Sequence, residues 1–310
     1  MPNEEFMMAA IQAAPVPYDR EASLDKAVTL IEEAGKLGAT IAAFGEAWLP
    51  GFPLHVFQPP RASLPWKAAA QYLDNAVTIP SPTTDALCQA AKRAGVDVVI
   101  GIGELDPLTS GTVYCTLLFI GREGKILGRH RKLKPTFAER TVWGDGDSKG
   151  LRAYERPYGR ISGLNCWEHN MVLPTYALAQ QGTNIHVAAW PGQDYAPAQD
   201  EIQPHYTRQV LLSRAFASQT ASYVIATSGV RTIEDIPEEF RSLNPVLHTG
   251  HSIIIDPRGE IVAGPVEGEQ ILTHVGSMET IRIAKAMCDI GGHYSRPDVF
   301  DFAVRGRDAN

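Results

Sequence analysis

The sequence predicts one α/β domain with mixed sheets, in which helices cover the outer faces. Short apolar runs alternate with longer segments of helical periodicity along most of the 310 residues. Two tight-turn sequences in the middle and late parts of the chain add antiparallel hairpins to these βα units. The composition, 44% hydrophobic and 20% charged, is that of an ordinary globular protein, which excludes intrinsic disorder, collagen-like repeats and disulfide-rich secreted scaffolds.

The first part of the chain predicts three strands and two helices in βα order. The first strand is a nearly continuous apolar run, which is typical of a strand buried on both faces. In the first helix, apolar residues recur at helical spacing, and Gly38 can end it. The predicted strands are 6–14, 40–44 and 96–102, and the predicted helices are 24–37 and 84–94.

The remainder mixes hairpins with buried strands and further helices. Tight turns at 121–124 and 256–259 predict the two hairpins. The hairpin strands are 113–120 with 125–131 and 252–255 with 260–263; the buried strands are 160–165 and 184–189; the helices are 171–181, 204–223 and 278–289. The last twenty residues are predicted to be irregular.

Charge and cysteine content narrow the functional classes. The net charge of −7, from 28 Lys and Arg against 35 Asp and Glu, gives no global electrostatic reason to bind nucleic acid or an anionic membrane. Four scattered cysteines without zinc spacing suggest a reducing compartment. The acidic N-terminus lacks the basic region of a signal peptide, and no apolar run approaches the ~18 residues that cross a bilayer. We therefore expect a cytoplasmic protein.

The first segment that carries chemistry runs from Phe44 to Pro53. An apolar strand ends near Glu46, and a loop rich in Pro, Gly and aromatic residues follows. Ligands of α/β sheets gather at the carboxyl ends of strands. A carboxylate there, walled by Trp48 and Phe52, would be desolvated, which raises its pKa and suits a general base near neutral pH. The alternative is a carboxylate that only caps a turn.

The second segment runs from His130 to Arg140. Four of its first five residues are potentially cationic, and they follow a predicted strand directly. A fixed ammonium that meets developing negative charge stabilises an oxyanion. The alternative is a solvated basic loop, but Pro135 follows at once and Glu139 adds an acid beside Arg140.

The third segment runs from Gly163 to Asn170. A strand leads into Cys166 and a helix is expected a few residues later, which is the geometry of a nucleophile elbow. A helix N-terminus and a cation such as Lys132 would lower the pKa of this thiol. The alternatives are a buried structural cysteine, as we expect for the other three, a Cys–His protease site with His169, and a metal site that adds Glu168.

Together, the three segments resemble the nitrilase superfamily of carbon–nitrogen hydrolases. The Glu46 motif, the His-Arg-Lys-Leu-Lys-Pro-Thr motif at Lys132 and the Cys-Trp-Glu motif at Cys166 occur in the family's order, with similar separations of 86 and 34 residues. Cys-Trp-Glu resembles true nitrilases, whereas amidase branches more often carry Asp or Tyr-Asp after the cysteine. The resemblance covers almost the whole chain and includes residues 132–148 and 292–298.

This resemblance implies a four-layer α-β-β-α sandwich of the nitrilase type with mixed sheets. One carbon–nitrogen hydrolase domain would span residues 1–310, with a C-terminal segment at roughly 290–310. The resemblance implies that Cys166 is the nucleophile, Glu46 the general base, Lys132 the cation that stabilises the tetrahedral species and Glu139 an additional catalytic glutamate. It implies no cofactor and no metal.

The implied activity is hydrolysis of a small-molecule nitrile to the carboxylic acid and ammonia through a cysteine-bound thioimidate and thioester. An amidase of the same superfamily is the main alternative, ahead of a non-catalytic relative or a thiol protease. We expect Trp48, Phe52, Trp167 and Trp190 to bind the substrate, although the loop at Trp190 could equally close a turn.

Two departures from the family pattern concern a strand end and the chain's end. Gly45 stands where members often have Pro before the glutamate. The chain stops thirteen residues after Pro297, whereas many nitrilases continue into a tail associated with spiral oligomers. We therefore expect a homodimer or small even homo-oligomer rather than long filaments.

Overall fold

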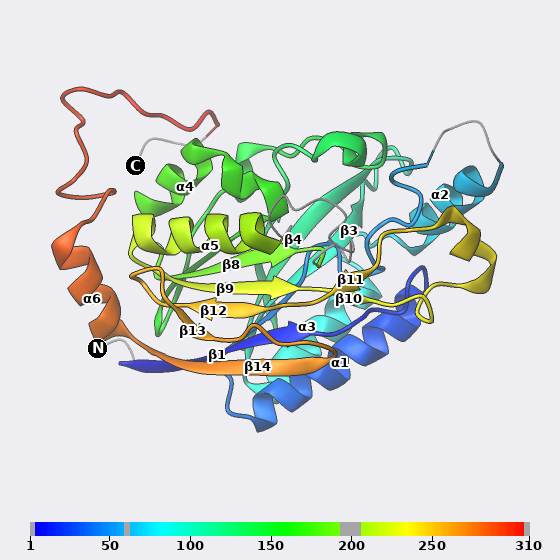
Figure 1. Ribbon diagram of the computed structural model, residues 1–310, viewed down its shortest axis with the longest axis horizontal. Helices are drawn as coiled ribbons and strands as arrows, with labels where there is room; N and C mark the ends of the chain where they lie inside the picture. Colours follow the sequence, from blue (N-terminus) through cyan, green and yellow to red (C-terminus); the bar gives the residue numbers. More distant parts are fainter. Residues whose placement is uncertain (1–3, 59–62, 193–205, 307–310) are drawn as a thin grey trace.

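Two six-stranded mixed sheets lie face to face, and helices cover the outer face of each (Figure 1). The computed structural model describes residues 4–58, 63–192 and 206–306. The architecture is the predicted α-β-β-α sandwich, so this expectation is confirmed.

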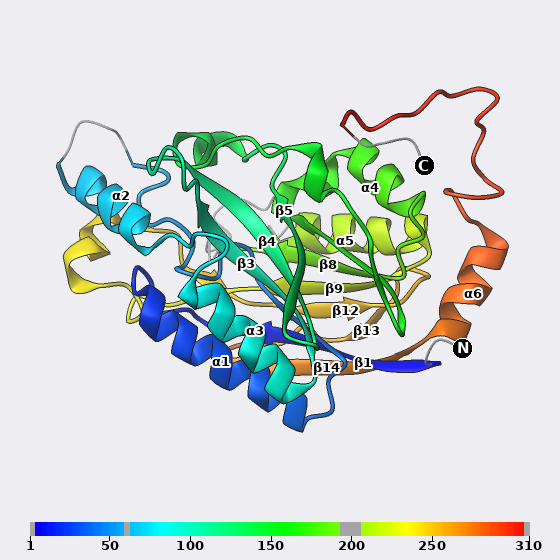
Figure 2. The same ribbon diagram turned by 180° about the vertical axis from the view of Figure 1, so that it is seen from behind.

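The first sheet, called sheet A, carries the N-terminal βα units. Its order is β14 (Gln270–Ser277), β1 (Glu5–Gln12), β2 (Ile41–Phe44), β3 (Asp97–Leu105), β4 (Val113–Gly121) and β5 (Lys125–Arg131). Its outer face is covered by α1 (Arg20–Lys36) and α3 (Pro82–Ala94), which lie side by side (Figure 2). Strands β1, β2 and β3 are parallel, whereas β4 and β5 form the predicted hairpin.

The second sheet, called sheet B, carries the later elements. Its order is β13 (Ile261–Ala263), β12 (Ile253–Ile255), β9 (Tyr223–Ser228), β8 (Ile185–Trp190), β7 (Gly159–Asn165) and β6 (Tyr154–Arg156). Helices α4 (Val172–Ala179) and α5 (Tyr206–Thr220) cover its outer face (Figure 1). The parallel strands β7, β8 and β9 end at the same edge, next to the end of β2.

Local sequence explains the boundaries of the helices on sheet A. Asp19 caps α1 by accepting the backbone N–H of Ala22, and the buried residues Leu24, Ala27, Ile31 and Ala34 follow at helical spacing. Ser81 and Thr84 form a capping box at the start of α3. Gly95 ends α3 in the left-handed conformation, with a φ of 67°.

Close backbone approach joins the two sheets at the end of β2. Within sheet A, a Cβ atom on Gly101 would lie 2.2 Å from the Gly45 carbonyl oxygen. Between the sheets, a Cβ atom on Gly45 would lie 2.8 Å from the Trp190 carbonyl oxygen. The Glu46 backbone N–H donates to that Trp190 carbonyl at 3.0 Å. Gly45 therefore lets sheet A contact sheet B directly beside Glu46.

The structure corrects one predicted helix and adds elements that the sequence pattern missed. The predicted helix 204–223 ends at Thr220, because Ala221 turns to a φ of 51° and Tyr223 begins β9; residues 204 and 205 lie outside the described ranges. Helix α2 (Ser63–Asn75) and edge strand β14 were also missed. Strand β14 is half-exposed along most of its length, so it lacks the apolar run that marks the buried strands.

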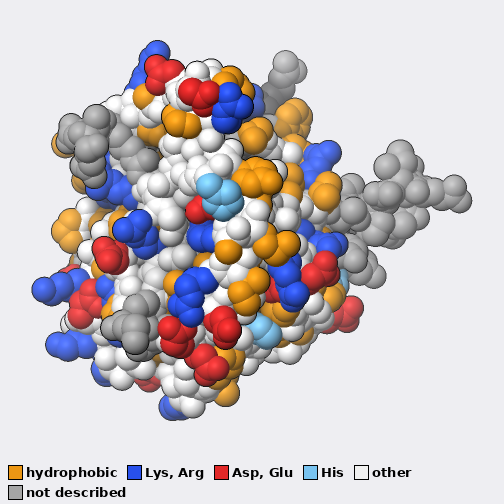
Figure 3. Space-filling view, turned by 90° about the vertical axis from the view of Figure 1, so that its left-hand side faces the viewer, with side chains coloured by type: hydrophobic (Ala, Val, Ile, Leu, Met, Phe, Trp, Pro, Cys, Tyr) orange, Lys and Arg blue, Asp and Glu red, His pale blue; other side chains and the backbone are white. Residues whose placement is uncertain are grey.

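The surface is mixed in character. At the end of the molecule where α6 (Met278–Met287) lies, acidic and basic side chains are interspersed with hydrophobic ones (Figure 3). Among the helices of the described ranges, none is both long enough and apolar enough to cross a membrane.

Candidate active site

Lys132 lies at the centre of a buried ionic cluster. It directly follows β5, and its backbone N–H donates to the Cys115 carbonyl at 2.7 Å. Its Nζ lies 2.7 Å from Glu46 Oε1 and 2.6 Å from Glu139 Oε2. All three side chains are buried. One ammonium therefore faces two carboxyl groups in a site from which water is largely excluded.

The two carboxyl groups reach Lys132 from different elements. Glu46 follows β2, where the contact between the sheets holds its backbone. Glu139 lies in the first turn of the 3₁₀ helix Phe137–Thr141, and its Oε2 also accepts the Thr136 backbone N–H at 2.7 Å. This capping contact fixes the position of the Glu139 carboxylate beside the Lys132 ammonium.

Cys166 completes the cluster from sheet B. It lies where β7 meets the 3₁₀ helix Cys166–Asn170, and its φ of 47° is left-handed. The sulfur and one oxygen each of Glu46 and Glu139 all lie within 4.8 Å of one another. The structure thus brings together the four side chains to which the resemblance assigns catalytic roles, and the sharp strand-to-helix turn exposes the thiol to them.

Burial and the neighbouring charges decide which groups of this cluster carry a proton. Burial raises the pKa of Glu46 to about 7; the charge of Lys132 opposes this shift and that of Glu139 adds to it. Burial alone lowers the pKa of Lys132, but the charges of Glu46, Cys166 and Glu139 outweigh it and raise this pKa well above its ordinary value. The cluster therefore holds a permanent ammonium beside a carboxyl group that exchanges its proton near neutral pH.

The expected lowering of the pKa of Cys166 is wrong. Burial, followed by the negative charge of Glu46, raises the pKa of the thiol well above its ordinary value, and Lys132 and the Trp167 backbone N–H offset this only in part. The prediction counted the cation and the helix terminus but not the dry, net-negative surroundings. The thiol is therefore protonated at rest and needs a base to become a nucleophile.

Within the described ranges, one group of three side chains could together bind a metal ion, and it consists of Glu46, Glu139 and Cys166. Their geometry is explained without a metal, because the Lys132 ammonium contacts both carboxylates. The metal site that the sequence left open, with Glu168 and His169, is not formed among these side chains. Glu168 contacts His130 at 3.0 Å, and His169 Nδ1 lies 2.7 Å from the Cys166 carbonyl oxygen.

The same contact argues against a Cys–His protease site. His169 donates to the backbone of Cys166 rather than facing the thiol as a base. Burial lowers the pKa of His169 to about 4, so it is neutral at physiological pH.

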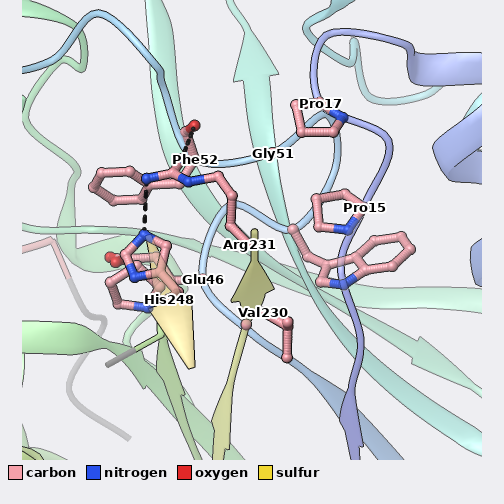
Figure 4. A pocket seen from close by; sticks show the side chains of 11 residues that line it. Pro15, Pro17, Glu46, Gly51, Phe52, Val230, Arg231 and His248 are labelled. Atoms are coloured by element: carbon pink, nitrogen blue, oxygen red, sulfur yellow. Dashed lines mark hydrogen bonds between the residues drawn. The ribbon is translucent and has the colours of Figure 1, made fainter. Parts of the chain in front are cut away.

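A pocket opens beside Glu46, lined by Pro15, Pro17, Glu46, Trp48, Gly51, Phe52, Pro191, Gly229, Val230, Arg231 and His248. Trp48 is fixed there by its indole N–H, which donates to the Ala13 carbonyl at 2.8 Å. The Arg231 guanidinium donates to the Phe52 carbonyl and contacts His248 Nε2 at 2.9 Å (Figure 4). The pocket thus combines aromatic side chains with a buried cation near Glu46.

The four aromatic residues predicted to bind substrate have different surroundings. Trp48 and Phe52 line the pocket. The Trp190 ring stacks on His169 and its indole N–H contacts Ser213, whereas its neighbour Pro191 lines the pocket. Trp167 is 43% exposed. The role of each in substrate binding stays a prediction.

Two side chains, Cys115 and Glu168, make contacts at the site that the sequence did not predict. The Cys115 thiol, predicted to be structural, lies 3.5 Å from Glu46 Oε1. The Glu168 carboxylate accepts the backbone N–H groups of Leu133 and Asn165, each at 2.8 Å, and thereby ties the end of β5 to the Cys166 turn. The Cys-Trp-Glu motif contained Glu168, but nothing in the sequence showed what it would bind.

Comparison with known proteins places these features in a family. The family model described as "Carbon-nitrogen hydrolase" matches residues 7–285. A relative named "Nitrilase 2", from an unknown prokaryotic organism, is 51% identical over 307 residues, covering 97% of this chain and 92% of the relative. An "Aliphatic nitrilase" of Rhodococcus rhodochrous is 36% identical over 312 residues, covering 97% and 83%.

Solved structures show the same fold. A Saccharomyces cerevisiae member of branch 10 of the nitrilase superfamily is similar, with a TM-score of 0.73 at 22% identity, over 94% of this chain and 97% of that one. An amidase from Nesterenkonia sp. is similar with a TM-score of 0.66 at 16% identity, over 93% and 96%.

Proposed function

Because this chain belongs to the carbon–nitrogen hydrolase family, we propose that it is a nitrilase, which converts an organic nitrile to the carboxylic acid and ammonia. The observation that carries the proposal is the buried cluster of one thiol, one ammonium and two carboxyl groups. Similarity to proteins named nitrilase favours this branch of the family. Measuring ammonia and acid released from a panel of nitriles tests it.

The first half of the reaction forms a covalent adduct. Ionised Glu46 takes the proton of the Cys166 thiol, and the sulfur attacks the nitrile carbon. An S–C bond forms, one C–N π bond breaks, and its electron pair moves to nitrogen, which takes up a proton to give a thioimidate. Lys132 lies beside Glu46 and stabilises the negative charge that develops on nitrogen.

The second half consumes two waters. Glu46 activates the first, which adds to the thioimidate carbon; nitrogen leaves as ammonia after a further protonation, and a thioester remains. The second water cleaves the thioester to the acid and restores the thiol. If sulfur leaves the tetrahedral species before nitrogen does, the product is the amide. Glu139, which shares the Lys132 ammonium with Glu46, supports the proton transfers.

We expect kcat/KM to fall as the pH falls through about 7, because Glu46 must be ionised and its pKa is raised to that value. The corresponding effect on stability has the opposite sign: a raised carboxyl pKa contributes stability at low pH that is lost as the pH rises from about 4.5 through 7. Measuring kcat/KM from pH 5 to 9 gives the pH at which the activity falls.

A variant tests the cause of this acid limb, the fall of kcat/KM at low pH. The charge of Glu139 raises the pKa of Glu46, so Glu139→Gln should move the acid limb of the residual activity to lower pH. Glu239→Gln, in a surface ion pair with Lys67, is the matched control and should leave it in place. An acid limb near pH 4.5 in the wild type would contradict the assignment of Glu46.

We further propose a homodimer that buries a patch on α4 and α5. Val172, Leu173 and Leu211 there are 70%, 67% and 62% exposed, and the two helices pack together. Light scattering should give twice the chain mass, and Leu173→Glu should shift the protein towards monomer. Leu108→Glu, at a position 92% exposed and outside the patch, should not. A monomeric wild type at micromolar concentration would rule out this interface.

A further inference from the structure

A chain of buried polar side chains leads from the Cys166 backbone to the outer face of sheet B, where α5 covers it. His169 Nδ1 lies 2.7 Å from the Cys166 carbonyl oxygen, and His169 Nε2 lies 3.0 Å from His186 Nε2. His186 Nδ1 then contacts Ser162 Oγ at 2.8 Å, and Ser162 Oγ contacts Thr183 Oγ1 at 2.6 Å. We call His169, His186, Ser162 and Thr183 the histidine relay; all four are buried.

Hydrogen-bonding rules fix the direction of every bond in the relay. A carbonyl oxygen only accepts, so His169 Nδ1 carries a proton and donates to Cys166. Two N–H groups cannot face each other, so of the two Nε2 atoms only one is protonated. Burial keeps both rings neutral, because it lowers the pKa of each, and His169 Nε2 is therefore the acceptor. His186 then donates through Nε2 and accepts the Ser162 hydroxyl at Nδ1, and Thr183 donates to Ser162.

Strand pairing holds the middle of the relay, and aromatic rings hold both of its imidazoles. Ser162 on β7 and His186 on β8 are direct partners in the parallel register of sheet B. The His186 ring stacks on Phe216 of α5 at a centroid distance of 3.7 Å, and the His169 ring stacks on Trp190 at 5.4 Å. These contacts prevent the imidazoles from rotating away from their partners.

The end of the relay holds a residue in an uncommon backbone conformation. Cys166 has a φ of 47°, in the left-handed region that side chains with a Cβ atom rarely adopt. Such conformations persist only where surrounding contacts hold them. The turn is held on one side by Glu168, which binds the Asn165 backbone N–H, and on the other by His169, which binds the Cys166 carbonyl.

We propose that the histidine relay is a positioning device for the nucleophile: through the His169–Cys166 hydrogen bond it holds the left-handed turn that aims the thiol at Glu46 and Lys132. This rests on the proposed role of Cys166. Misplacement of a reacting group by about 1 Å can cost about 10²-fold in rate. The relay contains none of the described residues that line the pocket beside Glu46, so loss of the relay should lower kcat and leave KM nearly unchanged.

The test compares two substitutions of His169. His169→Leu removes the donor, and we expect kcat and the rate of Cys166 alkylation by iodoacetamide to fall together, by about 10- to 100-fold. His169→Asn places an amide N–H near the position of Nδ1 and should stay within a few-fold of the wild type in both. Ser162→Ala removes the hydroxyl that donates to His186. This hydroxyl is two hydrogen bonds away from His169, so its loss should lower both rates by a smaller factor. This variant replaces His169→Leu in the test if His169→Leu does not fold.

Leu178→Ala is the matched control. Leu178 lies on α4 and is buried in the same hydrophobic cluster as Trp190 and Phe216, which contact the relay, but it is not a member of the relay. The substitution should lower Tm and leave kcat per folded enzyme unchanged. If His169→Leu lowers only Tm, as this control does, or if His169→Asn is as slow as His169→Leu, the proposal is wrong. Alkylation is measured without a nitrile, so a failure of the proposed substrate would leave this readout intact.

Discussion

Cys166→Ala should lower kcat by at least about 10⁴-fold, because it removes the thiol that forms the covalent thioimidate. The fold should be retained, since alanine removes only a sulfur and tolerates the φ of 47° no worse than cysteine does. Ammonia release and a thermal melt measure the two quantities. Cys88→Ala, at another buried cysteine on α3, is the matched control and should keep wild-type activity.

Alkylation provides an independent check of the nucleophile. Iodoacetamide should modify Cys166 first among the four thiols, because Glu46 lies within reach to take its proton and because Cys166, unlike Cys115 beside the same carboxylate, is not completely buried. Mass spectrometry of partly modified protein identifies the site. Equal modification of all four cysteines, or turnover in Cys166→Ala near that of the wild type, would remove Cys166 from this role.

Lys132→Met should lower kcat by about 10²- to 10⁴-fold, because it removes the charge that stabilises the developing anion. It also leaves Glu46 and Glu139 facing each other in a dry site, where both cannot stay ionised. Removing one partner of a buried ion pair costs up to about 3–5 kcal/mol of stability, so Tm should fall as well. Kinetics should therefore be measured per folded enzyme, at a temperature below the transition.

Lys134→Met is the matched control for Lys132. Lys134 lies two residues away, is half-exposed and pairs with the equally exposed Asp145, so its replacement should change kcat less than about two-fold. If Lys132→Met raises KM and leaves kcat unchanged, Lys132 binds substrate and does not stabilise the transition state.

Much of the site followed from where strands end. Glu46, Lys132 and Cys166 each follow a predicted strand, and ligands gather at such ends. Apolar runs predicted β2 and β7, and the hairpin turn predicted β5. The hairpins were also predictable, because their turns need Gly and Pro at set positions.

What could not be predicted depends on register and burial. Ser162 and His186 are 24 residues apart and meet only because β7 and β8 pair in parallel. The pKa of Cys166 is raised by burial and by a carboxylate from the other sheet, neither of which is visible in its local sequence. The contact between Cys115 and Glu46 likewise needs the registers of β2 against β3 and of β3 against β4.

The branch of the family is the central claim, and paired substrates test it. The measurement is kcat/KM for a nitrile and for the amide with the same side group, with acid, amide and ammonia quantified in each reaction. The proposed chemistry predicts that the nitrile is converted mainly to acid, with one ammonia per acid, and that the amide is the poorer substrate. Hydrolysis of the amide ten times faster than of every nitrile tried would show an amidase instead.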